Sequence, residues 1–152
     1  MIVPDLNLLI YAYNDGAPQH VNARNWWETL LRGEETVGLP WIVTTGFVRL
    51  MANHSFVSSP LSPPDAADIV RNWFLYPHII SLNPGNDHLR YFRQNLEVPG
   101  SGPNLVTDAH IAALAMEQDA EVHTYNSSDF ARFTDLGLRW RNPLREDRLE
   151  RE

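Results

Sequence analysis

The stretch "NLVTDAHIAALA", residues 104–115, says more about the fold than any other part of the chain. Every residue from 111 to 116 is apolar, so a helix here has no wide polar face and is expected to lie buried at the centre of the protein. Asp108 stands near the start of this helix, where unpaired backbone N–H groups favour a carboxylate and where Asn104 or Thr107 can cap the first turn. Asp108 is therefore either an ordinary helix-entry residue or part of a site, and its neighbours in the fold decide which.

The composition indicates a single folded domain. The chain has 152 residues, of which 43% are hydrophobic, and its five Trp and six Phe are enough to build a real core. Because there is no cysteine, neither a disulfide framework nor a Cys-type zinc site is possible. The opening residues "MIVPDLNLLIYAYND" have no basic leader and resemble neither a signal peptide nor a membrane span, so we expect a cytoplasmic protein with no membrane association.

The charge balance argues against broad electrostatic binding of nucleic acid. The net charge is −7, whereas phosphate contacts need clustered cations. All 12 cationic residues are Arg, which pairs with phosphates and stacks on bases, although genome base composition explains a chain without Lys equally well. A nucleic-acid site in this chain would therefore have to be local.

Strand and helix patterns alternate along the chain and indicate an α/β sandwich with a mainly parallel sheet. Strands are expected at 1–5, 78–82, 120–125 and 137–140. Besides the helix at 104–116, we expect helices at 8–13 capped by Asn7, at 20–32 ended by Gly33, at 39–53 with Pro40 near its start, at 61–76 with a capping box from Ser62 to Asp65, and at 86–96, with 126–133 a loop or short helical turn.

Acidic and amide residues occupy the ends of these predicted elements. Asp5 ends the first strand, Asp108 begins the buried helix, and Asn126 and Asp129 lie just after the strand at 120–125. The carboxyl ends of parallel strands share one edge of a sheet, so these side chains are expected to converge. Crowded carboxylates repel unless a cation joins them, and ligands that are all oxygen suit Mg²⁺ or Mn²⁺.

Three segments resemble the motifs of PIN domains, in the same order and at similar spacing. They are "MIVPDLNLLIYAY" at the start, "NLVTDAHIAALA" in the centre and "HTYNSSDFARF" near the end. The resemblance covers residues 1–144 and is closest to the VapC-type toxins of bacterial toxin–antitoxin pairs. It leaves residues 145–152 as a charged tail, expected to be solvated.

The resemblance implies a three-layer α/β/α fold, a ribonuclease that depends on Mg²⁺ or Mn²⁺, a homodimer, and a VapB-like antitoxin that blocks the site. Matched position by position, it assigns Asp5 and Asp108 as metal-binding aspartates and Asn126 and Asp129 as the final acidic segment, with Asn7, Thr107 and Thr124 as supporting polar residues.

One position departs from the family pattern. PIN nucleases commonly have a Glu in the helix after the second segment, but this chain has Gly46 there, within "TTGFVRL". Glycine in a helix costs about 1 kcal/mol relative to alanine, so something should offset that cost. Either Gly46 allows another segment to approach closely, or it has a role in the site. Whether another acid, such as Glu35, substitutes is left open.

Several other residues are weaker candidates. His110 is either a substrate contact or a helix-entry histidine bonded to a neighbour, and Arg49 is either a phosphate contact or a solvated surface residue. Trp26 and Trp27 suit core or dimer packing better than base stacking. The histidines lack the close spacing of a zinc site.

The reaction expected is metal-assisted hydrolysis of a phosphodiester in structured RNA, such as tRNA or rRNA. Asp5 and Asp108 would hold Mg²⁺, and Asp129 with Asn126 would complete the cluster or orient the attacking water. Two other functions remain possible. With Gly46 in place of an acid, the domain would bind RNA or antitoxin without cutting, or the same acids would serve a metal-dependent phosphatase of small molecules.

Overall fold

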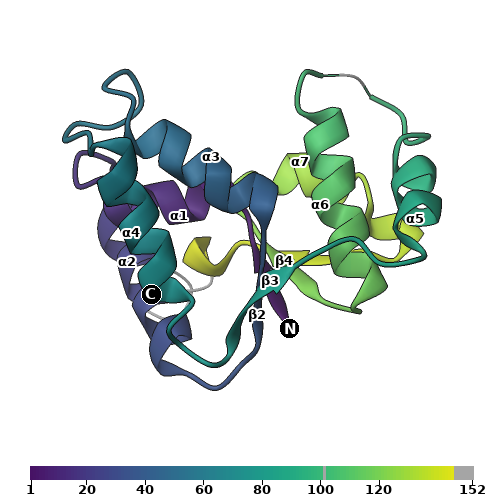
Figure 1. The fold of residues 1–152 in the computed structure, drawn as a ribbon. Helices are drawn as coiled ribbons and strands as arrows, with labels where there is room; N and C mark the ends of the chain where they lie inside the picture. The colour runs from purple at the N-terminus through teal and green to yellow at the C-terminus, as the bar shows by residue number, and fades with distance from the viewer. Residues whose placement is uncertain (101, 146–152) are drawn as a thin grey trace.

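The computed structural model describes residues 1–100 and 102–145, and the fold is an α/β sandwich (Figure 1). In chain order its elements are β1 (Ile2–Pro4), α1 (Leu6–Tyr13), α2 (His20–Arg32), β2 (Val37–Pro40), α3 (Trp41–Met51), α4 (Pro63–Trp73), β3 (Ile79–Leu82), α5 (His88–Asn95), α6 (Leu105–Glu117), β4 (Glu121–His123), α7 (Ser127–Ala131), a 3₁₀ turn (Thr134–Leu136) and β5 (Arg139–Arg141).

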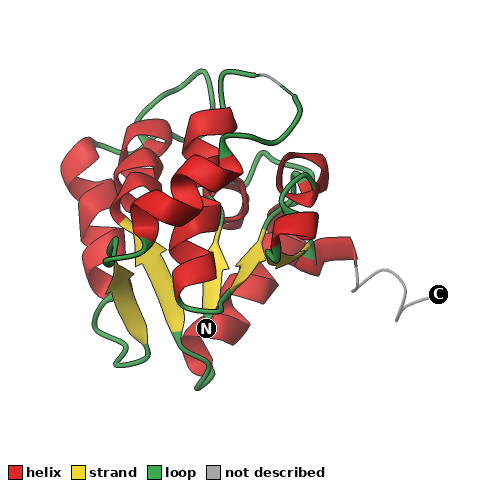
Figure 2. Cartoon of the chain, turned by 90° about the vertical axis from the view of Figure 1, so that its right-hand side faces the viewer, coloured by secondary structure: helices red, strands yellow, loops and turns green. Residues whose placement is uncertain are grey.

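The five strands form one parallel sheet in the order β3-β2-β1-β4-β5. Helices pack on both faces of this sheet (Figure 2). The three-layer α/β/α architecture with a parallel central sheet is therefore confirmed. Because β1 lies in the middle with β4 beside it, the residues that follow these two strands meet at the centre of the carboxyl edge.

The strand β2 was not predicted from the sequence. Residues 39–53 read as one helix, but Val37–Pro40 form a strand and α3 begins only at Trp41. All four residues of β2 are buried, and a fully buried strand lacks the alternation of apolar and polar residues that identifies a half-exposed one. Pro40 ends the strand and holds the N-cap position of α3, without a side-chain capping bond.

The helix termini test three of the expected caps. Asp5, not Asn7, is the N-cap of α1, and its Oδ1 accepts a hydrogen bond of 2.8 Å from the backbone N–H of Leu6. Ser62 caps α4 as predicted, accepting a bond from the N–H of Asp65. Asn104 holds the N-cap position of α6, but its side chain makes no capping bond within the described part of the chain. The prediction that Asn7 caps α1 is wrong, because Asp5 holds that position.

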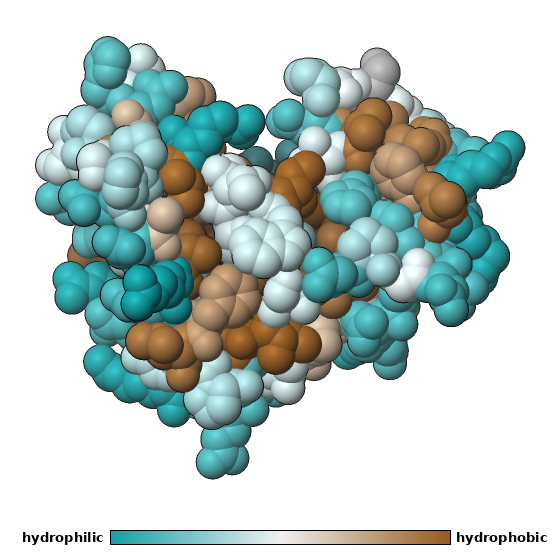
Figure 3. Space-filling view, in the orientation of Figure 1, coloured by the Kyte–Doolittle hydropathy of each residue, from teal (hydrophilic) through white to brown (hydrophobic). Residues whose placement is uncertain are grey.

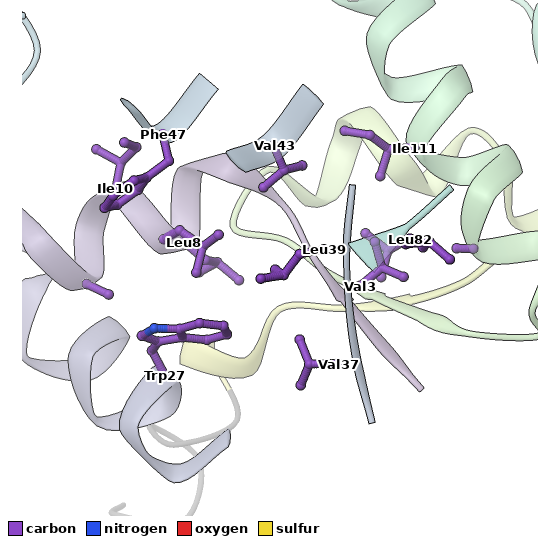
Figure 4. Packing of buried hydrophobic residues seen from close by; sticks show 14 of the residues in the cluster. Val3, Leu8, Ile10, Trp27, Val37, Leu39, Val43, Phe47, Leu82 and Ile111 are labelled. Carbon is purple, nitrogen blue, oxygen red and sulfur yellow. The ribbon is translucent and has the colours of Figure 1, made fainter. Parts of the chain in front are cut away.

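The core lies between the sheet and its helices (Figure 4). Leu8 from α1, Leu39 from β2 and Ile111 from α6 are among its buried side chains, and α6 is buried along most of its length, as its sequence predicted. Trp26 and Trp27 pack in this core, which confirms their structural role. Within residues 1–100 and 102–145, no helix combines the length and the apolar character needed to cross a bilayer.

Candidate functional site

Asp5 lies at the carboxyl end of the central strand and is held there from three directions. Its backbone N–H donates to the carbonyl of His123 at the end of β4, with a distance of 2.8 Å. Its Oδ1 caps α1, and its Oδ2 accepts a hydrogen bond of 2.8 Å from the hydroxyl of Thr124. The residue is 9% exposed. Both carboxylate oxygens of Asp5 therefore have fixed donors, which orient the group before any ligand binds.

Asp108 lies in the first turn of α6 and is 7% exposed. Its Oδ2 accepts a hydrogen bond from Nη2 of Arg132 at 3.0 Å, which is also an ion pair. Arg132 stands at the C-cap of α7 and was not identified from the sequence. The available signal was its position three residues after Asp129, since residues three apart share a helix face.

Asp129 and Asn126 differ in how they meet the site. Asp129 is in the first turn of α7 and is half-buried, and its charge raises the pKa of both Asp5 and Asp108. The side chain of Asn126 is exposed, and its backbone N–H donates to Oγ1 of Thr124 at 3.1 Å. Asp129 is thus the carboxylate that acts electrostatically on the other two, while Asn126 orders the turn after β4.

Burial and mutual repulsion dominate the electrostatics of this site. Loss of solvent raises the pKa of Asp5 to about 6, although the hydrogen bonds from Thr124 and Leu6 oppose the change. The pKa of Asp108 is raised to about 7, first by burial and then by the charges of Asp5 and Asp129, against the opposing effect of Arg132. A bound cation would favour the ionised form of these carboxylates, because its charge offsets their burial and their mutual repulsion.

The supporting residues predicted from the motifs lie around these acids. Thr124 bonds Asp5 directly, and Oδ1 of Asn7 accepts a bond of 3.3 Å from the backbone N–H of Tyr125. Nδ2 of Asn7 is buried without a hydrogen-bond partner among the described residues. Thr107 is half-buried next to Asp108. Thr124 and Asn7 thus tie the start of α1 to the turn after β4.

Gly46 lies on α3 against the residue that follows Asp5. A Cβ built on Gly46 would stand 2.7 Å from Cδ2 of Leu6, which is closer than side chains approach. The interpretation that Gly46 permits a close approach is therefore confirmed, and α3 offers no acid at this position. Glu35 does not replace it, because its Oε1 pairs with the amino group of Met1 at 3.3 Å, before the start of β1 and away from its carboxyl end.

His110 and Arg49 are not brought to the acids by the contacts of the described residues. Nδ1 of His110 lies 2.8 Å from Nε2 of His88 on α5, and burial beside His88 lowers the pKa of His110. Residues two apart on a helix point about 200° apart, so His110 faces away from Asp108. Arg49 is exposed in the last turn of α3.

The donors present fit a hard divalent cation. Asp5, Asp108 and Asp129 offer oxygen only, and burial raises the pKa of the first two even though Arg132 pairs with Asp108. Within residues 1–100 and 102–145, no three His, Cys, Asp or Glu side chains already surround one point. Mg²⁺ does not need such a cage, because it usually keeps several waters and takes one or two carboxylates.

The surface is hollowed on the side where α3 and α6 face each other across the carboxyl edge of the sheet (Figure 3). Such a position suits an extended substrate better than an enclosed small-molecule pocket, because ligands of open α/β sheets bind outside the carboxyl ends of the strands.

Comparison with known proteins gives matches along nearly the whole chain. The model of the PIN domain matches residues 2–136. Ribonuclease VapC33 of Mycobacterium tuberculosis is 40% identical over 146 residues, covering 96% of this chain and 100% of that protein. Ribonuclease VapC37 of the same species is 36% identical over 143 residues, covering 94% of this chain and 97% of that protein.

Solved structures share the fold at low sequence identity. Mycobacterium tuberculosis VapC20, described as a sarcin-ricin loop cleaving toxin, superposes with a TM-score of 0.62 at 14% identity, covering 91% of this chain and 96% of that one. VapBC2 of Rickettsia felis, bound to a promoter DNA fragment, gives a TM-score of 0.61 at 21% identity, covering 93% and 98%.

Proposed function

This chain belongs to the PIN-domain family, among the VapC ribonuclease toxins of toxin–antitoxin pairs, and we propose on that premise that it is a Mg²⁺- or Mn²⁺-dependent endoribonuclease of structured RNA. The observation that carries the proposal is the coupling of Asp5, Asp108 and Asp129. These carboxylates come from distant parts of the sequence. Besides burial, the charge of Asp129 raises the pKa of Asp5, and the charges of Asp5 and Asp129 raise the pKa of Asp108. Repulsion of this kind is costly for stability and is relieved by a bound cation.

Asp5 and Asp108 are the residues that would hold the metal, with Asp129 completing the set. Asp129 is preferred to Asn126 because it is the residue whose charge acts on the other two acids. A bound Mg²⁺ would neutralise charge on the phosphate and lower the pKa of the attacking water. Thr124 and the N–H of Leu6 keep Asp5 oriented, and Asn7 keeps the turn after β4 next to it.

The substrate class proposed is folded RNA, such as tRNA or rRNA. The fold neighbour VapC20 is described as cleaving the sarcin-ricin loop, which supports a structured target for a chain of the same fold. The net charge of −7 means that attraction to RNA must come from the metal and from nearby Arg side chains, not from the surface as a whole.

The proposed partner is a VapB-like antitoxin, and the proposed assembly is a homodimer in the cytoplasm. Structures of the same fold include VapBC complexes, which supports the first proposal. An apolar groove of about 500 Å³ runs between α3 and α4, where Trp41 is 55% exposed and Phe74 packs against it. Exposed apolar surface of this kind is typical of protein-binding sites.

Cleavage of a labelled tRNA, an rRNA hairpin and p-nitrophenyl phosphate separates the possible functions. We expect Mn²⁺-dependent cutting of one folded RNA, complete inhibition by EDTA and no release of nitrophenol. RNA binding without cleavage at any metal concentration would identify a binding module. Hydrolysis of the ester without RNA cleavage would identify a phosphatase.

A further inference from the structure

Arg132 makes a contact that the proposed chemistry leaves unexplained. Its guanidinium bonds Oδ2 of Asp108 at 3.0 Å and lies over the ring of Phe133, 5.3 Å from the centroid. Phe133 is completely buried, and the side chain of Arg132 is 18% exposed. The guanidinium is therefore held at the border between the protein interior and the solvent beside the site.

The contact places a permanent cation on a carboxylate that a metal ion would use. Arginine does not lose its proton in proteins, so its charge remains at any working pH. Nε of Arg132 is buried without a partner among the described residues, and the hydrogen bond to Asp108 is donated by Nη2. A divalent ion bound to the same carboxylate would repel the guanidinium, because like charges a few ångströms apart in a partly buried site interact strongly.

We propose that Arg132 is a resident counterion: it neutralises Asp108 in the metal-free protein, gives it up when a divalent cation binds, and then offers its freed guanidinium to a phosphate of the RNA. This inference rests on the proposed metal-dependent function. The ring of Phe133 keeps the side chain near the site after its partner is lost, and the planar guanidinium pairs with phosphate oxygens through two parallel bonds.

Calorimetric titration with Mn²⁺ at pH 8.5 tests the competition, because it needs no catalysis. We expect Arg132→Gln to bind Mn²⁺ roughly fivefold or more tightly than the wild type, the range typical of coupled binding events. Arg90→Gln is the matched control, since it removes the same charge from an exposed residue of α5 that pairs only loosely with Asp87 at 3.8 Å. Its affinity should equal that of the wild type. Arg132→Met, which retains the stem over Phe133, replaces the glutamine variant if that variant fails to fold.

The release of Arg132 to RNA has a separate readout. In Ca²⁺, used in place of Mn²⁺ to limit cleavage, we expect Arg132→Gln to weaken binding of a folded RNA measured by fluorescence anisotropy, by roughly tenfold. Arg132→Lys keeps the charge but not the two parallel bonds, so it should retain the Mn²⁺ affinity of the wild type and lose part of the RNA affinity.

The outcomes separate this inference from the function on which it rests. A wild-type protein that binds no Mn²⁺ would overturn the proposed function itself. If the wild type binds Mn²⁺ and folded Arg132→Gln binds it equally or more weakly, Arg132 is a structural ion pair only. Tighter Mn²⁺ binding with unchanged RNA affinity would refute the transfer of the guanidinium to RNA.

Discussion

The hydroxyl of Thr124 donates a hydrogen bond of 2.8 Å to Oδ2 of Asp5, although 119 residues separate the two in the sequence. The bond joins the ends of β1 and β4, the neighbouring strands at the centre of the sheet. It also favours the ionised form of Asp5 and so opposes the effect of burial on its pKa. One side chain thereby contributes both to the position and to the charge of a proposed metal ligand.

Thr124→Val should weaken Mn²⁺ binding most strongly at acidic pH. Loss of the hydroxyl raises the pKa of Asp5 beyond its value of about 6, so protons compete with the metal over a wider range. Calorimetry at pH 6.5 and pH 8.5 should show a larger loss of affinity at the lower pH. An equal loss at both values would mean that Thr124 acts only by positioning Asp5.

Asp5→Asn should abolish RNA cleavage while the protein remains folded. Asparagine retains the cap of α1, whereas alanine would also lose about 1 kcal/mol of helix stability, which makes Asn the cleaner substitution. We expect a reduction in the cleavage rate of roughly 100-fold or more, and loss of growth inhibition in cells. Asp135→Asn, at an exposed acid of the 3₁₀ turn, is the control and should cleave normally. Wild-type activity in folded Asp5→Asn would exclude Asp5 as a ligand.

Asp108→Asn should stabilise the metal-free protein at neutral pH while removing cleavage. The folded pKa values of Asp5 and Asp108, about 6 and about 7, lie above their unfolded values, so the folded state binds protons more tightly. The free energy of unfolding is thus highest below about pH 4 and falls as the pH rises through 6 and 7.

The neutral amide removes the destabilisation that ionised Asp108 causes. Part of this gain is lost because the amide no longer forms the ion pair with Arg132. Differential scanning calorimetry in EDTA at pH 7.5 should therefore show a Tm higher by about 3–6 °C, and the gain should disappear near pH 4. A lower Tm with cleavage retained would return Asp108 to the role of a helix-entry residue.

Gly46→Ala should be destabilising in the wild type and stabilising when Leu6 is truncated. The added methyl group meets Cδ2 of the half-buried Leu6 at 2.7 Å, and overpacking costs about 1–3 kcal/mol, so we expect the cost to exceed the gain of about 1 kcal/mol in helix propensity unless Leu6 moves aside. In a Leu6→Ala background only the gain remains. A double-mutant cycle by urea unfolding measures this coupling. Additive effects would show that Leu6 moves aside without cost.

Much of the fold could be predicted because its signals are local. Residues 111–116 contain no polar side chain, so burial of α6 follows from composition alone. The cap of α4 by Ser62 could be predicted because its sequence pattern lies within four consecutive residues. The strand β2 was missed because all four of its residues are buried. Such a run has no alternation of apolar and polar residues, so it cannot be distinguished in the sequence from the start of a helix.

Only part of the candidate site could be predicted from the sequence. That Asp5, Asp108 and Asp129 should approach one edge follows from the order of strands and helices, and the pKa effects among them agree with it. The sequence already indicated that His110 faces another side of the helix than Asp108, since residues two apart on a helix point about 200° apart. Arg132 could not have been paired with Asp108, because that requires the relative placement of α6 and α7.

By itself, the sequence determined the helix and strand periods, the buried centre at α6 and the order of the acidic segments, because each depends on neighbouring residues. Only the tertiary structure decided that Thr124 holds Asp5, that Arg132 neutralises Asp108 and that Leu6 fills the space of a side chain at Gly46. These relations join residues far apart in the chain. They depend on how helices rotate and pack against the sheet, which side-chain volume and burial settle jointly across the whole core.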